Sequence, residues 1–405
     1  MKYFIALFFL FSSLFITAQD TLTVMAYNIL NYPASNASKA DTLKPIIKHV
    51  QPDIFLITEL TSFSGINLIL NDALNVDGIS HYQSATYYDG PDTDNMLFYN
   101  SNKLELYSQY EIPTSLRNIS EYVLFYKSPG LGPGDDTIFI HCYMAHLKAS
   151  QGWSNEQQRN QEAVVFKNYL DNKAATLENV IFAGDMNIYG DYEAAFNTIL
   201  NGGSVNLYDP INSPGLWHAN SFFANIHTQS PRTAILPDGG SNGGMDDRFD
   251  WMFVSDDVRS GHNYFKYIPN SYYALGNDGN HYNQSILAAP TNTSAPQNII
   301  EALHYMSDHL PVIMKTEIGY NVSIKEEATT PWKGYYANQY FHFSSENVEE
   351  KLTIEIYDLL GKLLQTAQIN NQNQFQLAIN KNIKGVFILK ITSNKTQQSF
   401  RLLAQ

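Results

Sequence analysis

The chain has 405 residues, of which 44% are hydrophobic and 13% aromatic, and this is enough for a substantial core in two or three domains. Its formal net charge is −14, which argues against tight, nonspecific nucleic-acid binding through a broad basic face. A metal site can offset negative charge locally, so a nucleic-acid substrate is not excluded. The single cysteine, Cys142, excludes an intrachain disulfide and a cysteine-built zinc site.

The N-terminus has the features of a secretory signal peptide over residues 1–19. Lys2 precedes an apolar run over residues 3–16, and small residues follow, so cleavage is expected after Ala18 or Gln19. The run is too short for a comfortable membrane span, and no later stretch is long and apolar enough to be one. We therefore expect a protein without a transmembrane span that is secreted to the medium or the cell surface.

Between residues 20 and 320, strand patterns alternate with a few helical ones. Several strands are continuously apolar, as in a sheet that is covered on both faces. This interleaving predicts an α/β domain built in layers. The residues from 236 to 248 are rich in glycine and predict a flexible loop. The expected strands are 21–28, 53–59, 96–99, 123–126, 137–146, 180–185 and 248–254, and the expected helices are 38–50, 155–170 and 192–200.

The chain changes character after residue 320. Residues 321–335 are polar and contain Thr-Thr-Pro, which predicts a linker. Residues 336–405 show short alternating strands without a helix signal, and 70 residues are enough for a small all-β sandwich. This module contains no cluster of acids and histidines, so we assign it no chemistry.

Polar residues recur where the predicted strands of the first domain end. Taken singly, an acid or amide at a strand end is a turn or cap residue, and a histidine in an apolar run is a core residue. Taken together, they are expected to meet, because strand ends on one edge of an α/β sheet converge on a common crevice. The residues at strand ends are Asn28, Glu59, His146, Asp185, Asn187, Asp308 and His309, and Asp250 adds one position inside a strand.

Metal-assisted hydrolysis of a phosphoester is the chemistry that this set of side chains suits. Oxygen ligands without thiolates favour Mg²⁺, Mn²⁺ or Ca²⁺ over zinc. Glu59, at the end of a buried strand, is the expected metal ligand, with Asn28 and Asp308 near it. The cation would polarise a phosphoryl oxygen and stabilise the charge that grows in the transition state.

The remaining residues suit proton transfer and positioning. His309 is the expected general base, and Asp250 would fix its tautomer by a hydrogen bond to the far ring nitrogen. Asp185 and Asn187, two residues apart, would orient the attacking water or the phosphate. His146 would donate a hydrogen bond or a proton to the phosphate or to the leaving oxygen.

At these residues the chain resembles the endonuclease/exonuclease/phosphatase superfamily, which includes deoxyribonucleases, neutral sphingomyelinases and inositol polyphosphate phosphatases. The resemblance implies two packed β-sheets flanked by helices, in four layers, with a metal at the sheet edges and the roles given above. Arg159 resembles the arginine on the family's helix, although an exposed helix charge is an equal interpretation. The motifs, in the family's order, are Ala-Tyr-Asn-Ile-Leu at 26–30, Thr-Glu at 58–59, His-Leu-Lys-Ala at 146–149, Gly-Asp-Met-Asn at 184–187, Arg-Phe-Asp-Trp at 248–251 and Ser-Asp-His-Leu-Pro-Val at 307–312.

The substrate is less well defined than the reaction. No basic helix suited to duplex DNA is evident, and a segment rich in Tyr and Asn at 270–300 is unlike the compact nucleases. We expect an extracellular nuclease that acts on nucleic acid. The alternatives are a sphingomyelinase-like hydrolase of phospholipids or small phosphoesters, or a non-catalytic surface binding protein. The tail resembles the C-terminal sorting domain of type IX secretion in Bacteroidetes, which implies that the secretion machinery is a partner; a generic β-sandwich binding module is the alternative.

Overall fold

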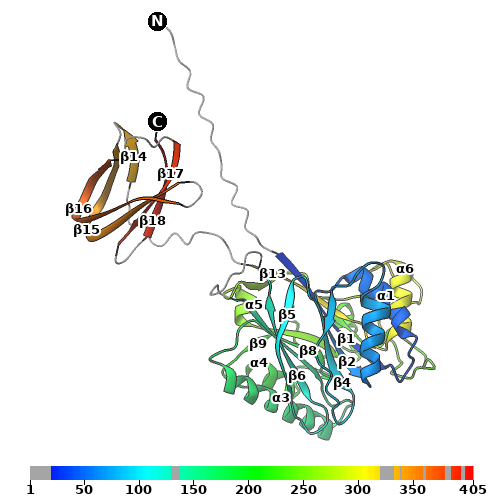
Figure 1. Ribbon diagram of the computed structural model, residues 1–405. Helices are drawn as coiled ribbons and strands as arrows, with labels where there is room; N and C mark the ends of the chain where they lie inside the picture. Colours follow the sequence, from blue (N-terminus) through cyan, green and yellow to red (C-terminus); the bar gives the residue numbers. More distant parts are fainter. Residues whose placement is uncertain are drawn as a thin grey trace. The chain divides into compact units, whose positions relative to one another are not determined.

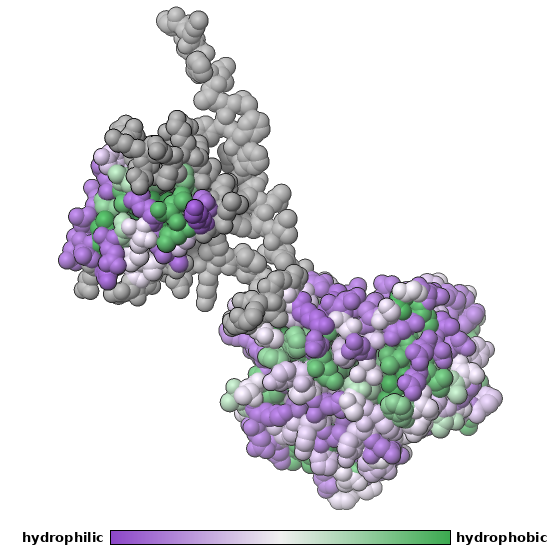
Figure 2. Space-filling model, in the orientation of Figure 1, coloured by the Kyte–Doolittle hydropathy of each residue, from purple (hydrophilic) through white to green (hydrophobic). Residues whose placement is uncertain are grey.

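The computed structural model describes residues 20–128, 137–319, 333–337, 340–358, 362–378, 385–393 and 397–404. The expected signal peptide, residues 1–19, and residues 321–332 of the expected linker lie outside this part of the chain. Two compact units are formed, one over residues 17–321 and one over the C-terminal residues 322–405 (Figure 1). On the visible face of the larger unit, polar and apolar residues are interspersed (Figure 2).

The first sheet of the larger unit has seven strands in the order β11-β13-β1-β2-β4-β3, and β12 pairs with β13. Its two central strands, β1 and β2, run parallel, with Asn28 opposite Thr58. Their other neighbours, β13 and β4, are antiparallel to them. The strands are β1 (Asp20–Tyr32), β2 (Ile54–Leu60), β3 (Tyr82–Ser84), β4 (Asp94–Asn100), β11 (Phe265–Tyr267), β12 (Tyr273–Ala274) and β13 (Val312–Ile318).

The second sheet has six strands in the order β5-β6-β7-β8-β10-β9. It repeats the design of the first, because its central strands β7 and β8 are parallel and place His146 opposite Asp185. On the other side of β8, the antiparallel β10 places Asp250 opposite the same Asp185. The strands are β5 (Leu104–Ile112), β6 (Ile119–Tyr126), β7 (Phe139–His146), β8 (Val180–Asp185), β9 (Leu207–Tyr208) and β10 (Asp250–Ser255).

Helices cover the outer faces of both sheets, so the unit has four layers as expected (Figure 1). The helix α1 buries Leu43, Ile46 and Ile47 at helical spacing and packs against α6. On the second sheet, α3 packs against α4. The helices are α1 (Lys39–Val50), α2 (Phe63–Leu68), the π-helix η1 (Ile69–Leu74), α3 (Trp153–Lys173), α4 (Ala194–Asn201), the 3₁₀-helix η2 (Ser221–Ile226), α5 (Asp256–Ser260) and α6 (Gln297–Met306).

The residues of β8 that precede Gly184 are all apolar, because both faces of this strand are buried. Ile181 and Ala183 belong to the core between the two sheets, whereas Val180 and Phe182 belong to the core beneath α3. The rings of Phe182 and Phe166 of α3 stack with 3.9 Å between their centroids. A strand buried on both faces needs apolar residues at every position, and the fully buried Cys142 on the neighbouring β7 serves the same core.

The C-terminal unit is all-β in its described residues. Its five strands are antiparallel, and the long β15 pairs with β14 through its first half and with β17 through its second half. Phe341, Leu352 and Phe375 are among the residues of a separate apolar core. The strands are β14 (Lys333–Ala337), β15 (Tyr340–Tyr357), β16 (Leu363–Ala378), β17 (Gly385–Thr392) and β18 (Gln397–Ala404).

Two expectations differ from the structure in detail. The segment 236–248, expected to be a flexible loop, is held by side chains, because the buried Arg232 contacts both carboxylate oxygens of Asp238. Asp250, expected inside a strand, is instead the first residue of β10. Within the described part of the chain, none of the helices has the length and apolar character that a membrane crossing requires.

Candidate active site

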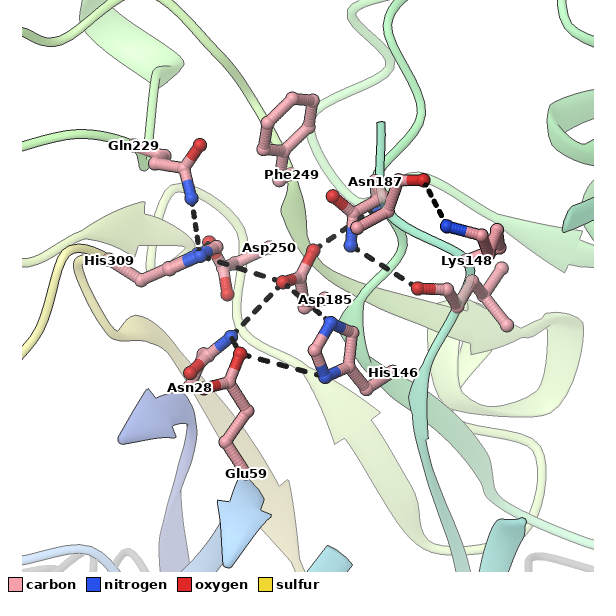
Figure 3. Close-up of polar contacts among 12 residues, drawn as sticks. Asn28, Glu59, His146, Lys148, Asp185, Asn187, Gln229, Phe249, Asp250 and His309 are labelled. Atoms are coloured by element: carbon pink, nitrogen blue, oxygen red, sulfur yellow. Dashed lines mark hydrogen bonds and ion pairs between the residues drawn. The ribbon is translucent and has the colours of Figure 1, made fainter. Parts of the chain in front are cut away.

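Side chains from the ends of five strands meet at one edge of the two sheets (Figure 3). The first sheet contributes Asn28 and Glu59, from β1 and β2. The second contributes His146, Asp185 and Asp250, from β7, β8 and β10. The convergence follows from the parallel pairs at the centre of each sheet, whose carboxyl ends point to the same edge.

The backbone at this edge adopts conformations that ordinary side chains avoid. Glu59 and Asn187 have φ angles of 64° and 50°, in the left-handed region. At Gly184, with φ of 139°, a Cβ atom would lie 1.8 Å from the carbonyl oxygen of Ala145. Only glycine permits so close an approach of β8 to β7, and the approach sets His146 beside Asp185. Such strain is typical of functional sites.

Three ligand atoms lie together at the centre of the site. Glu59, His146 and Asp185 each offer one, and these atoms all lie within 4.8 Å of one another. The Nδ1 atom of His146 is 3.7 Å from Oε1 of Glu59, and its Nε2 atom is 3.5 Å from Oδ2 of Asp185. Nδ1 of His146 is buried without a hydrogen-bond partner, as expected of an atom that faces an ion. The group fits a divalent cation.

Electrostatics favour the same conclusion. Burial raises the pKa of Glu59, and the charge of Asp308 raises it further. Burial also raises the pKa of Asp185 to about 7, against the lowering effect of His309. Burial, with the nearby cations, lowers the pKa of His146 well below its usual value, so its imidazole is neutral. Crowded carboxylates with a neutral imidazole are the condition that a bound cation relieves.

Asn28 contacts two of these ligand residues through its side-chain amide. Its Nδ2 atom donates to Oε1 of Glu59 at 2.8 Å and to Oδ2 of Asp185 at 3.1 Å. Its Oδ1 atom accepts from the backbone N–H of Leu30. Asn28 therefore bridges the carboxylates of the two sheets.

Asp308 lies next to the group but outside the three clustered ligand atoms. Its Oδ2 atom accepts from the backbone N–H of Ser241 at 2.6 Å. A Cβ atom at Gly240 would lie 2.8 Å from its carboxyl carbon, so the segment 236–244 is packed directly on it. Asp308 acts on Glu59 and His309 through its charge, which raises the pKa of both.

His309 and Asp250 form the expected pair. The Nδ1 atom of His309 is 2.7 Å from Oδ2 of Asp250, and its Nε2 atom is 3.5 Å from Oδ2 of Asp185. Burial lowers the pKa of His309, but the charges of Asp250, Asp185 and Asp308 outweigh it and raise the pKa well above its usual value. An imidazole so placed lies next to the clustered ligand atoms, and it can accept a proton once a bound cation offsets the carboxylate charges that raise its pKa.

Asn187 lies beside Asp185 as its spacing predicts. Its backbone N–H donates to Oδ1 of Asp185 at 3.2 Å, and its side-chain amide donates to the carbonyl of Leu147 at 3.3 Å. The free oxygen of its amide therefore stays beside the site, in a fixed orientation (Figure 3).

Arg159 is buried, so the interpretation as an exposed helix charge is wrong. Its guanidinium makes two contacts of 2.8 and 2.9 Å with Glu193. It also donates to the carbonyls of Lys148 and Ser150, which follow His146 in the chain. Arg159 thus fixes the segment that leaves the site from β7.

Two further residues of the site carry no signal in the sequence. Gln229 contacts His309, and the Thr228 hydroxyl accepts from the backbone N–H groups of Phe249 and Asp250. Both lie in an irregular segment, where no periodicity or motif points to them. Their roles follow from tertiary contacts alone.

The arrangement is that of a phosphoester hydrolase whose reactive residues stand at the edges of two packed sheets. Residues 25–309 match the model of the Endonuclease/Exonuclease/phosphatase family, and the chain belongs to that family. Residues 337–405 match the model of the Secretion system C-terminal sorting domain. A comparison with curated proteins gave no match.

Solved structures of low sequence identity resemble the larger unit. TDP2 of D. rerio, in complex with a single-strand DNA product, is 14% identical, with a TM-score of 0.46, over 73% of this chain and 98% of that one. TDP2 from C. elegans is 17% identical, with a TM-score of 0.47, over 74% and 75%. The human Nocturnin catalytic domain with bound sulfate is 16% identical, with a TM-score of 0.43, over 74% and 97%.

Proposed function

We propose that this protein is a secreted phosphodiesterase that depends on a divalent metal and acts as an extracellular nuclease. The observation that carries the proposal is the position of the His309–Asp250 pair. The Nε2 atom of His309, the ring nitrogen that Asp250 does not contact, is 3.5 Å from Asp185, and Asp185 is itself one of the three clustered ligand residues. A base for water and a site for a phosphate-binding cation are therefore adjacent.

His309 would take a proton from water while the water oxygen forms a bond to phosphorus. Asp250 holds the proton on Nδ1, which leaves Nε2 as the acceptor. Asp185 and Asn187 would orient the water and a phosphate oxygen from beside it. The bond from phosphorus to the leaving oxygen then breaks, and that oxygen takes up a proton from solvent.

Glu59, Asp185 and His146 would hold the cation, with Asn28 and Asp308 supporting Glu59. When bound, the ion supplies stabilisation of the negative charge on the phosphoryl and leaving oxygens. The two carboxylates suit Mg²⁺, Mn²⁺ or Ca²⁺. The lowered pKa of His146 supports a neutral ligand or hydrogen-bond donor in preference to a proton donor.

Export is supported by the C-terminal match to a sorting domain. Together with the apolar N-terminal run, it supports a location outside the cell or on its surface. A hydrolase exported in this way meets extracellular nucleic acid, and Arg117 and Lys148 supply positive charge close to His146 for a phosphate backbone. The overall charge of −14 limits nonspecific grip on long duplexes.

Hydrolysis of a phospholipid is the second candidate, and exposed apolar side chains favour it. Trp153 is 75% exposed and follows the segment after His146, whereas Tyr192, 60% exposed, follows the segment after Asn187. Large apolar residues that stay in water are typical of surfaces that contact lipid or another partner.

The test uses the full-length chain with plasmid DNA, RNA and a choline phospholipid, in Mg²⁺, Mn²⁺ or Ca²⁺ and in chelator. His309→Ala is compared with His49→Ala, a histidine in the last turn of α1 that is exposed. Cleavage of nucleic acid that chelator and His309→Ala abolish, and His49→Ala preserves, is the expected result. Turnover of lipid alone would show that the substrate is a phospholipid and not nucleic acid. No turnover in any metal would favour the non-catalytic surface protein.

A further inference from the structure

The side chain of Gln229 occupies the nitrogen of His309 that hydrolysis needs. Nε2 of the Gln229 amide is 2.6 Å from Nε2 of His309 (Figure 3). The other ring nitrogen is already bound to Asp250. A water molecule therefore cannot lie on the ring nitrogen of His309 while Gln229 is in this position.

The backbone of Gln229 is fixed on both sides. Its N–H donates to the carbonyl of Asp247 at 3.1 Å, and its own carbonyl accepts from the N–H groups of Asp246 and Asp247 at 2.9 and 3.0 Å. An isolated bridge joins it to His309 as well. Release of His309 therefore needs only rotation of the Gln229 side chain, which is half-buried and has rotatable bonds of its own.

The chemistry of an amide suits a contact that is made and released. A primary amide carries both donor hydrogens and an acceptor oxygen, so it can bind His309 whether or not Nε2 bears a proton. It carries no charge, so it holds the ring less firmly than a carboxylate would. Once the amide rotates away, a water or phosphate oxygen can take the place of the amide at Nε2, and this place lies beside Asp185, whose Oδ2 atom is 3.5 Å from Nε2.

We propose, on the basis of the hydrolytic function proposed above, that Gln229 is a displaceable cap on His309 that substrate must remove. The capped form does not bind substrate productively, so the apparent KM is the intrinsic KM divided by the fraction of molecules that are uncapped. The cap leaves kcat unchanged, because the amide is already displaced in the enzyme–substrate complex. Gln229 is thus a positioning residue and not a catalytic one.

The kinetic test compares Gln229→Ala with Gln229→Glu. Loss of one net hydrogen bond shifts an equilibrium by roughly fivefold, so Gln229→Ala should lower KM for a phosphodiester about fivefold at constant kcat. A carboxylate binds imidazolium more strongly, so Gln229→Glu should raise KM about tenfold. Gln161→Ala, at an exposed position of α3, is the matched control and should leave both constants unchanged.

A second measurement does not depend on turnover. Diethyl pyrocarbonate modifies an unprotonated imidazole nitrogen, and peptide mapping gives its rate at each histidine. With Mg²⁺ at pH 8, His309 should react about fivefold faster in Gln229→Ala than in the wild type, and more slowly in Gln229→Glu. The exposed His49 is the internal reference, because its rate should be the same in all three proteins.

The outcomes separate the cap from the proposed function. Faster modification of His309 with a lower KM supports the cap. An unchanged rate of modification, or a KM that rises or stays constant in Gln229→Ala, overturns it. If no form of the protein turns over a phosphodiester, the proposed function fails, and the modification rates alone decide whether Gln229 covers His309.

Discussion

Two buried histidines in this site have opposite protonation tendencies, and their neighbours explain the difference. His146 faces its carboxylates at 3.5 Å or more, so burial and the charges of Arg117 and Lys148 lower its pKa. His309 has Asp250 at 2.7 Å, and the surrounding carboxylates overcome the same cost of burial. The two imidazoles therefore differ in their tendency to bind a proton, because the distance to the nearest carboxylate differs.

The contribution of Asp250 is tested by Asp250→Asn. The amide keeps the shape of the side chain but cannot stabilise the imidazolium or hold a proton on Nδ1, so kcat for a phosphodiester should fall roughly 10²- to 10⁴-fold. Asp256→Asn, which removes an exposed partner of Arg259, is the control and should retain full activity. An equal loss of kcat in both variants would contradict the assignment. A loss of less than tenfold in Asp250→Asn would contradict it as well.

The pKa of Asp185 predicts how metal binding depends on pH. Its folded value of about 7 lies above its ordinary value of 3.8, so in metal-free protein this group lowers stability progressively as pH rises from about 4 to 7. Below pH 7, a cation must displace the proton on Asp185. The apparent affinity of the site for the cation should therefore fall roughly tenfold for each unit by which the pH is lowered.

Thermal unfolding with and without Mn²⁺ measures this effect. The rise in Tm at a fixed Mn²⁺ concentration should be larger at pH 8 than at pH 5.5, because bound metal stabilises according to its affinity. Asp185→Asn should give a small rise at both pH values. A rise that is the same at both pH values in the wild type would show that Asp185 does not bind the ion.

At the scale of elements, the segment 236–244 shows how a glycine-rich sequence becomes ordered. Asp238 lies 2.5 Å from Nζ of Lys39 at the start of α1 and also pairs with Arg232. Both cations are at most 3% exposed. The charges hold the segment in place, and the segment in turn presents the N–H of Ser241 to Asp308.

Removal of the Asp238 charge should therefore be costly. Asp238→Asn leaves two buried cations without a counter-charge, and the free energy of unfolding in urea should fall by about 3 kcal/mol. Asp77→Asn breaks the ion pair between Asp77 and Lys48, whose side chains are 63% and 52% exposed, respectively. This change should lower the free energy of unfolding by less than about 1 kcal/mol. A loss at Asp238 as small as that at Asp77 would show that the buried pair does not hold the segment.

Hydrophobic periodicity was sufficient to predict most elements, because it records burial directly. The helix α1, the strands β1, β2, β7 and β8, and the all-β tail were all predicted within a few residues. The segment 236–248 was mistaken for a flexible loop because composition does not reveal a counter-ion that lies two hundred residues away, on Lys39. The roles of Thr228 and Gln229 also cannot be predicted from turn residues in the sequence, because both reach the site through long-range contacts.

Seven of the eight site residues are predicted at strand ends, and Asp250 is predicted inside a strand. The structure joins seven of the eight, each to at least one other, by contacts of 3.7 Å or less. Asp308 is the eighth, and it contacts the segment 236–244 and acts on the others through charge. Its position was harder to predict because it follows a helix and precedes a strand, where the direction of the side chain depends on the loop that covers it.

At the scale of the whole molecule, the residues assigned to hydrolysis and the match to a sorting domain lie in different units. The described residues of the C-terminal unit form an apolar core of their own, and residues 337–405 match a sorting domain. The larger unit holds every residue to which we assign a role in hydrolysis.

The origin of the site in two sheets has a consequence for the time before folding is complete. Asn28 and Glu59 come from the first sheet, and their partners from the second lie more than eighty residues further along the chain. No short stretch of unfolded chain can gather these residues, so neither the proposed cation site nor the proposed base forms until both sheets have packed. The unfolded chain is therefore inactive, and a cell that exported it unfolded would contain no active hydrolase.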